Sequence, residues 1–265
     1  MNSGALAERV LVIVGGTSGL GLSAAKACIA AGAKTIIVGR DPETATAAEK
    51  SLGPAARGLA GDATDSATAD KAIRLAIDTF GSFHALYHVA GGSGRRAGDG
   101  PLHEITDAGW EQTLNHNLTS LFLSNRAAVR QFIAQKSSGV VLNMSSVLAY
   151  APSPAHFATH AYAAAKSAVI GFTKSCASYY ADRNIRFNVI APGLIETPMS
   201  KRAAGDERIM GFVATKQPLD GGRIGQPQDL DAAVVYLLSE QSKFVTGQVL
   251  AVDGGWSVSE GQTVA

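Results

Sequence analysis

Several features are scarce in this chain of 265 residues, and each scarcity argues against a class of protein. The two cysteines, Cys28 and Cys176, lie in stretches predicted as helices and lack C-x-x-C spacing, which favours buried thiols over a disulfide or a metal site. The formal net charge is +1 and the charges are scattered, so no basic field is available for a nucleic acid or a membrane surface. The expected partners are therefore small molecules.

Long apolar runs are also missing. No run approaches the roughly 20 residues that cross a bilayer, and residues 1–8 have neither the basic start nor the apolar stretch of a signal peptide. We therefore expect no membrane contact and a cytoplasmic location. No Pro/Ser-rich linker or shift in composition divides the chain, so residues 1–265 are predicted to form a single domain.

Short apolar runs rich in β-branched residues alternate with longer helical patterns. A run that is apolar on both faces is typical of a parallel strand covered by helices on both sides, so the alternation predicts a doubly wound, Rossmann-type α/β fold. We expect a parallel sheet of about seven strands. The predicted strands occupy residues 10–14, 35–38, 59–62, 84–89, 140–144, 187–190 and 249–252.

The first strand runs directly into a glycine loop and then a helix. The loop reads Gly15-Gly16-Thr17-Ser18-Gly19-Leu20-Gly21, and the helix extends to about Ala31. Glycines let the backbone approach a ligand closely, and a helix N-terminus directs N–H groups at a pyrophosphate. The spacing differs from the commoner GxGxxG pattern, which leaves a flexible turn as the alternative, but the flanking strand and helix favour dinucleotide binding.

The end of the second strand indicates which dinucleotide is preferred. Gly39 offers no carboxylate for a ribose hydroxyl, whereas Arg40 offers a planar cation suited to a 2′-phosphate. This favours NADP(H), with NAD(H) possible. Asp41, just before Pro42, is expected to cap the next helix rather than to contact the ribose. Asp62, at the end of the third predicted strand, could contact the adenine edge.

Tyr162 and Lys166 are one helical turn apart and so lie on one face of a helix. An ammonium roughly 5 Å from a phenol, at an effective dielectric of about 20, favours the phenolate by about 3 kcal/mol and lowers its pKa by about 2 units. Such a tyrosine could exchange a proton with a carbonyl or alcohol oxygen near neutral pH, the companion step to hydride transfer. The same spacing is common on alanine-rich helices, so the pair alone is weak. Ser145 and Ser146 follow a strand at the edge where open α/β sheets bind their ligands.

Three loops at that edge are expected to select the substrate. They comprise residues 92–100, 147–160 and 194–224. The first carries Arg95 and Arg96, which could hold an anionic substrate, although paired exposed arginines are usually solvated.

The other two loops allow alternatives. His156 and His160 could bind a metal if they shared a helix, but the nearby prolines favour a loop and no third ligand is evident, so we predict no metal site. Residues 199–213 are predicted to form a mobile amphipathic lid, with a simple surface helix as the alternative. A long helix is predicted from Thr106 to about Gln135, and Asn117 within it is expected to have a polar task.

Together, these motifs resemble the short-chain dehydrogenase/reductase (SDR) family in its single-domain form, over nearly the whole chain. The resemblance is carried by Gly15-x-x-x-Gly19-x-Gly21, Asp62, Ala90-Gly91, Asn117, Ser146, Tyr162-x-x-x-Lys166, Pro192-Gly193, Thr197 and Asp253-Gly254-Gly255. It implies an NADP(H)-dependent reductase or dehydrogenase that acts on a secondary alcohol/ketone pair. An NAD(H)-dependent dehydrogenase of a sugar or hydroxy compound is the alternative, and a cofactor-binding sensor without turnover is a third interpretation. The resemblance also implies a homotetramer, with residues 161–172 as a contact surface.

The resemblance implies roles for individual residues. Tyr162 would be the general acid/base, Ser146 would steady the substrate oxygen, and Lys166 would bond the nicotinamide ribose and lower the tyrosine pKa. Asn117 would hold a water that links Lys166 to solvent. The residues expected to bind the cofactor are Gly15, Thr17, Ser18, Gly19, Leu20, Gly21, Arg40, Asp62, Ala63, Ala90, Gly91, Tyr162, Lys166, Pro192, Gly193, Ile195 and Thr197.

The chain departs from the family pattern at two places. His88-Val89-Ala90-Gly91 stands where the family usually has Asn-Asn-Ala-Gly, which is expected to remove side-chain hydrogen bonds that steady the sheet beside the cofactor. The gap from Ser146 to Tyr162 is a few residues longer than is common, which predicts a remodelled substrate mouth.

Overall fold

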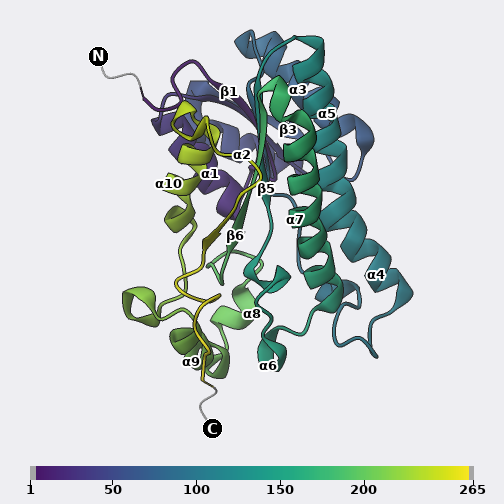
Figure 1. Ribbon diagram of the computed structural model, residues 1–265, viewed down its shortest axis with the longest axis vertical. Helices are drawn as coiled ribbons and strands as arrows, with labels where there is room; N and C mark the ends of the chain where they lie inside the picture. Colours follow the sequence, from purple (N-terminus) through teal and green to yellow (C-terminus); the bar gives the residue numbers. More distant parts are fainter. Residues whose placement is uncertain (1–3, 263–265) are drawn as a thin grey trace.

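Seven parallel strands form one sheet in the order β3-β2-β1-β4-β5-β6-β7 in the computed structural model, which describes residues 4–262 (Figure 1). The strands are β1 Val10–Val14, β2 Lys34–Gly39, β3 Ala56–Ala60, β4 Ala85–His88, β5 Gly139–Met144, β6 Ile185–Pro192 and β7 Val249–Val252. The predicted doubly wound fold is confirmed. Five strand ranges shift by a few residues. The third shifts most, because β3 pairs with β2 only as far as Gly39 opposite Ala60, so that Asp62 lies in the following loop.

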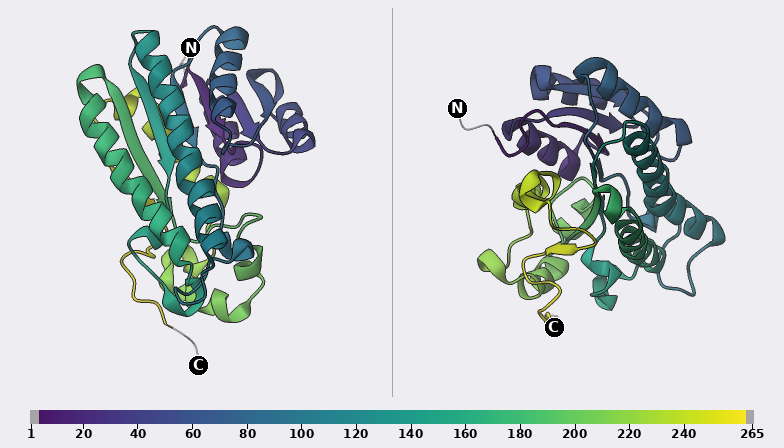
Figure 2. Two further views of the ribbon diagram at one scale, coloured as in Figure 1. Left: turned by 90° about the vertical axis from the view of Figure 1, so that its right-hand side faces the viewer. Right: turned by 45° about the horizontal axis from the view of Figure 1, so that its top comes forward.

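Helices cover both faces of the sheet (Figure 2). They are α1 Gly19–Ala30, α2 Pro42–Leu52, α3 Ser66–Phe80, α4 Asp107–Leu114, α5 Ser120–Ala134, α6 Pro154–Phe157, α7 His160–Tyr180, α8 Lys201–Ala204, α9 Glu207–Lys216 and α10 Asp231–Leu238. Along β1, Leu11 and Ile13 pack toward α1, α2 and α10, whereas the alternate residues Val10, Val12 and Val14 pack toward α3, α5 and α7. Side chains alternate between the faces of a strand, which is why β1 must be apolar throughout.

One predicted helix begins as its local sequence directs, and another is interrupted. The Asp41 carboxylate accepts a hydrogen bond from the Thr44 backbone at 2.7 Å, so its predicted capping of α2 is confirmed. The predicted long helix from Thr106 is interrupted at Asn115–Thr119 by a π-helical turn between α4 and α5. Such turns insert an extra residue into a helix and are frequent at functional sites.

Residues beyond the carboxyl ends of the strands build a separate layer. It contains α6, α8 and α9, which lie at the foot of the molecule in Figure 1. The predicted loop at 147–160 thus contains the short helix α6. Within residues 4–262, no helix is long and apolar enough to span a bilayer.

Candidate functional site

The glycine loop packs backbone against backbone. A Cβ at Gly21 would lie 2.1 Å from the Gly15 carbonyl oxygen, and Gly15 itself has a φ of 87° and lies against the Ala90 backbone. Neither position accepts a side chain without a shift of the main chain, because real Cβ contacts do not fall below 3.0 Å. The glycines at positions 15 and 21 therefore let strand, loop and helix pack backbone against backbone.

The N-terminus of α1 faces a segment that is distant in sequence. Ser18 is its N-cap but makes no side-chain capping bond, and no acidic residue lies in the first turn. A Cβ built at Gly19 would lie 3.6 Å from the Thr197 Cγ2, so the loop after β6 closes over the glycine loop. The uncapped N–H groups and the glycine cradle fit the pyrophosphate of a dinucleotide. Leu20 follows Gly19 in the first turn of α1.

Three charged or titratable side chains gather at the adjacent strand ends. Asp62 accepts two hydrogen bonds from Thr64, both 2.8 Å, and these lower the pKa of its carboxyl, with Arg40 and His116 adding to the effect. Burial lowers the pKa of His116, and the positive charge of Arg40 lowers it further. Arg40 and Asp62 therefore lie in one neighbourhood. His116 was missed because its position in a π turn is not readable from the sequence.

Gly39 is explained by packing as well as by its missing carboxylate. A Cβ at Gly39 would lie 2.1 Å from Thr17 Oγ1, so the threonine of the glycine loop occupies that space. Ala63 and Ala90 pack against the apolar core on the side of α3, α5 and α7. Gly193 lies against Gln217 and Asp253, leaving no room for a side chain.

The loop that follows β6 is anchored at both ends. Pro192 is the last residue of β6, and Ile195, only 7% exposed, forms an isolated parallel bridge with Gly225. The Thr197 backbone N–H donates to Ser200 Oγ at 2.9 Å. These contacts fix the segment that faces the glycine loop.

Ser146, Tyr162 and Lys166 meet where β5 ends. The Lys166 ammonium donates to the Met144 carbonyl at 3.1 Å, and the Ser145 hydroxyl donates to the Lys166 carbonyl at 2.8 Å. Lys166 Nζ lies 5.6 Å from the centroid of the Tyr162 ring. The predicted shared face of Tyr162 and Lys166 is confirmed, and α7 presents both side chains to the end of β5.

The expected direction of the Tyr162 pKa is wrong. Burial raises the pKa of the Tyr162 phenol to about 12, and a hydrogen bond with Ser146 opposes this only in part. Burial also lowers the pKa of the Lys166 ammonium to about 8. Both groups lose hydration at this site, and the loss disfavours the charged form of each more than their proximity favours it.

Asn117 lies on the π turn beside this cluster and is fully buried. Its side-chain amide donates to the Gly92 and Thr113 carbonyls, both at 2.9 Å, and its carbonyl accepts from the Gly92 backbone at 3.0 Å. A Cβ at Gly91 would lie 2.6 Å from Asn117 Oδ1 and 3.3 Å from Lys166 Nζ. The predicted polar task of Asn117 is therefore to fix the loop after β4 next to Lys166.

His88 stands where the family usually has asparagine, and it makes side-chain hydrogen bonds of its own. Its ring nitrogens lie 2.7 Å from Ser124 Oγ and 3.4 Å from Ser120 Oγ, on α5. Burial, with Lys166 adding to it, lowers the pKa of His88 to about 3, so the ring is neutral. At position 88 the expectation of lost hydrogen bonds is therefore wrong, because the residues of α5 that face His88 supply hydroxyl partners.

Asp99 joins the loop after β4 to the helix that carries Tyr162. Its two carboxylate oxygens accept from the Ala161 and Tyr162 backbone N–H groups at 3.0 and 2.9 Å, and the side chain is 6% exposed. A carboxylate at a helix N-terminus is favourable because it pairs with free N–H groups and with the helix dipole. Sequence reasoning missed Asp99 because it caps a helix that begins far along the chain.

The predicted substrate mouth contains an aromatic cluster formed by His156, Phe157, Phe212 and Trp256. The His156 and Phe212 rings are 5.1 Å apart, and Trp256 contacts Phe157 at 5.4 Å and Phe212 at 5.9 Å. The cluster belongs to an apolar core that includes Val147, the residue after Ser146. His156 lies in α6 whereas His160 begins α7, so the two histidines do not share a helix.

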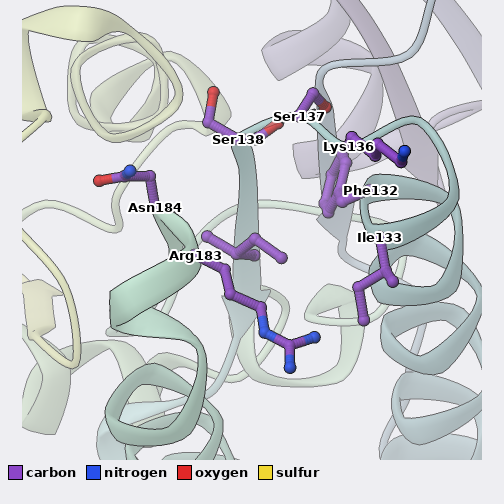
Figure 3. A pocket seen from close by; sticks show the side chains of 8 residues that line it. Phe132, Ile133, Lys136, Ser137, Ser138, Arg183 and Asn184 are labelled. Carbon is purple, nitrogen blue, oxygen red and sulfur yellow. Dashed lines mark hydrogen bonds between the residues drawn. The ribbon is translucent and has the colours of Figure 1, made fainter.

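A hollow of about 390 Å³ lies elsewhere on the molecule (Figure 3). It is lined by Phe132, Ile133, Lys136, Ser137, Ser138, Arg183, Asn184 and Ile185. These residues precede or begin β5 and β6, whereas Ser146 and Pro192 follow or end the same strands. The hollow is therefore at the opposite edge of the sheet and has no part in the candidate site.

The fold and the site define a dinucleotide-binding α/β protein with a polar cluster at the carboxyl edge of its sheet. A model of the family described as Enoyl-(Acyl carrier protein) reductase matches residues 14–257. A solved structure of a short-chain type dehydrogenase/reductase from Mycobacterium ulcerans gives a TM-score of 0.88 at 30% identity, covering 97% of this chain and 92% of that one.

Curated relatives agree with this class. The chain is 34% identical over 260 residues to 2-(S)-hydroxypropyl-CoM dehydrogenase 3 of Xanthobacter autotrophicus, covering 96% of this chain and 98% of that protein. It is 32% identical over 250 residues to a 3-oxoacyl-(acyl-carrier-protein) reductase of Vibrio harveyi, covering 94% and 98%. The chain belongs to the short-chain dehydrogenase/reductase family and is an oxidoreductase.

Proposed function

We propose that this protein transfers a hydride between NADP(H) and a secondary alcohol/ketone substrate, with Tyr162 as the general acid/base. The observation that carries the proposal is the convergence of Ser146, Tyr162 and Lys166 at the end of β5, beside Asn117. Nicotinamide supplies the hydride donor or acceptor when it is bound. The names of the two relatives span different substrates, so the family alone does not choose among them.

Each of the polar side chains has a separate task in this proposal. Because the pKa of Tyr162 is raised to about 12, its phenol is protonated at neutral pH, the form that donates a proton to a carbonyl oxygen. Ser146 orients that oxygen and hydrogen-bonds the phenol. Lys166 would hold the nicotinamide ribose, and its charge would stabilise the phenolate left after proton transfer. Asn117 holds the backbone beside Lys166 and, in the proposed relay, a water that links Lys166 to solvent.

Replacement of the Tyr162 hydroxyl tests this mechanism. Oxidation of NADPH and NADH, and the reverse reductions, would be followed over ketoesters, sugars, acyl thioesters and cyclic ketones. Tyr162→Phe should lower kcat by about 10²- to 10⁴-fold and leave cofactor binding unchanged. Near-normal turnover by Tyr162→Phe would sink the assigned role. Saturable cofactor binding by the wild-type protein with no turnover on any substrate would instead support the sensor interpretation.

Cofactor preference rests on Arg40, whose guanidinium is exposed near Asp62 and His116. The preference for NADP(H) over NAD(H) should fall about 10-fold or more in Arg40→Ala, because a charge-assisted phosphate contact is lost. Titration of NADPH and NADH into both proteins gives the ratio. An unchanged ratio would make NAD(H) the better assignment.

The remaining proposals concern the lid, assembly and location. We propose that residues 194–224, which include α8 and α9, form the lid of the single domain.

We also propose a cytoplasmic homotetramer, with α7 residues 161–172 among its contacts. Exposed apolar side chains such as Phe122 on α5 and Tyr179 on α7 offer surface for association. Light scattering that detects only a monomer would defeat the tetramer.

A further inference from the structure

Two arginines from distant segments meet at one backbone carbonyl in the substrate mouth, the region formed by residues 92–100, 147–160 and 194–224. Arg95 lies in the turn that follows β4, and Arg202 lies in α8 of the proposed lid. Their guanidinium groups donate to the same acceptor, the carbonyl of His156 in α6, at 3.2 and 3.3 Å. Three segments of the mouth therefore share one contact, and Figure 1 shows α6 and α8 in the same layer beyond the strand ends.

This arrangement brings two positive charges together, and no carboxylate in the part of the chain that the structure describes is in ion-pair contact with either. Among the ion pairs of residues 4–262, none involves Arg95 or Arg202. A guanidinium has five N–H donors, and one carbonyl can satisfy few of them. Partial burial lowers the pKa of Arg95, and the like charge of Arg202 lowers it further, against the attraction of Asp99. Both side chains are exposed, so a ligand can reach them.

The arginine pair lies close to the proposed reaction centre. Arg95 is four residues from Asp99, a distance of chain that spans at most about 14 Å, and Asp99 contacts the Tyr162 backbone at 2.9 Å. The ring of His156 contacts Phe212 of the aromatic cluster, whose apolar core reaches Val147 beside Ser146. An apolar wall therefore connects the arginine pair to the end of β5.

We propose that Arg95 and Arg202 bind an acidic group on the substrate, so that the substrate is an alcohol or ketone with a carboxylate, sulfonate or phosphate terminus. The inference rests on the proposed function and adds the substrate class. The planar forks of the two guanidiniums suit the oxygens of such an anion, which offsets their mutual repulsion. The carbon skeleton lies along the aromatic cluster, and the oxygen that reacts lies at Ser146 and Tyr162.

The test uses pairs of oxo compounds that differ in charge but hardly in shape. Levulinate and its amide, and oxocyclohexanecarboxylate and its amide, would be compared as substrates and, by calorimetry, as ligands of the cofactor-bound protein. The acid should be preferred in wild type, and the preference in kcat/KM and in Kd should fall about 10-fold in Arg95→Gln or Arg202→Gln and about 100-fold in the double variant. The amides should be unaffected. Arg96→Gln is the matched control, because Arg96 is an exposed neighbour that makes no hydrogen bond to His156.

Other outcomes of these measurements would decide against the anion site. Equal binding and turnover of acid and amide by the wild-type protein, or a preference that survives in the double variant, would overturn the anion site while leaving the proposed function intact. A double variant that binds NADPH more weakly but keeps its preference for acids would assign the arginines to the cofactor instead and would equally overturn the proposal. If no compound is turned over, the calorimetric preference for the acid still decides the anion site, whereas the missing turnover counts against the proposed function.

Discussion

The cofactor side and the substrate side of this site are built by different means. On the cofactor side, backbone meets backbone, and a Cβ at Gly21 would lie 2.1 Å from the Gly15 carbonyl. On the substrate side, side chains reach across to carbonyls, as when Trp256 Nε1 donates to the Ala151 carbonyl at 3.0 Å. Close backbone packing tolerates no added atom, whereas side-chain contacts can be exchanged without altering the sheet. We therefore expect substitutions on the cofactor side to cost stability and those in the mouth to cost chiefly turnover or selectivity.

The largest effect is expected where backbone packing is closest. Gly21→Ala should destabilise the fold by more than about 3 kcal/mol and lower cofactor affinity at least about 100-fold, because the methyl group must displace the first turn of α1. Urea unfolding and NADPH titration would measure the two effects.

Gly171→Ala is the matched control. Gly171 lies in α7 with nothing of its own chain within 4 Å of an added Cβ, so the change should stabilise the fold of the single chain by about 0.5–1 kcal/mol. If Gly21→Ala behaved like Gly171→Ala, the contrast between the two sides of the site would be lost.

His88, the last residue of β4 on the cofactor side, should make the stability of the fold sensitive to acid. Its pKa is about 3 in the fold and about 6.5 in an unfolded chain. The unfolded state therefore binds more protons between these values, and stability should fall as pH drops, by about 3 kcal/mol from this group at pH 4. His88→Gln should flatten that dependence in urea unfolding at several pH values. The other histidines with lowered pKa, His84 and His116, contribute in both proteins. Parallel curves would show that His88 is not the cause.

The buried charge of Lys166 should lower the stability of the fold. Its pKa is about 8 in the fold and 10.5 in the unfolded chain, so the protein must bury a charged ammonium below pH 8. The unfolded state binds more protons between pH 8 and 10.5, and this cost is relieved as pH rises through that window. Lys166→Met should therefore stabilise the fold at pH 7 by about 1–2 kcal/mol and lose turnover. The gain should shrink by pH 10. A destabilised variant at pH 7 would show that the Met144 contact outweighs burial of the charge.

Among the destabilising variants, a substitution of Asp99, which joins the loop after β4 to α7, should give the smallest change in stability. Asp99→Ala removes a carboxylate from two backbone N–H groups and should cost about 1 kcal/mol. Because Tyr162 is one of the two residues held, kcat should fall about 10-fold while the affinity for NADPH is kept. Steady-state kinetics and cofactor titration would separate these effects. Loss of cofactor binding in Asp99→Ala would show instead that Asp99 supports the cofactor side of the site.

Much of the cofactor side was predictable because its signals are local. The glycine loop directly follows β1, and the Tyr162–Lys166 spacing shares one helical face. The direction of the tyrosine pKa was not predictable, because pair spacing does not give burial, and burial dominates at this site. The hydroxyl partners of His88 were equally hidden, since Ser120 and Ser124 come from a helix more than thirty residues later.

The sequence by itself determined the doubly wound sheet and the helical face shared by Tyr162 and Lys166. These follow from the alternation of apolar runs and from the pitch of a helix. The space around each glycine of the first loop was decided by the tertiary packing. Only the tertiary structure decided that Arg95 and Arg202 meet at one carbonyl and that Asp99 caps α7. Such contacts join segments far apart in the chain, and loop conformation, which no periodic pattern encodes, sets which side chains meet.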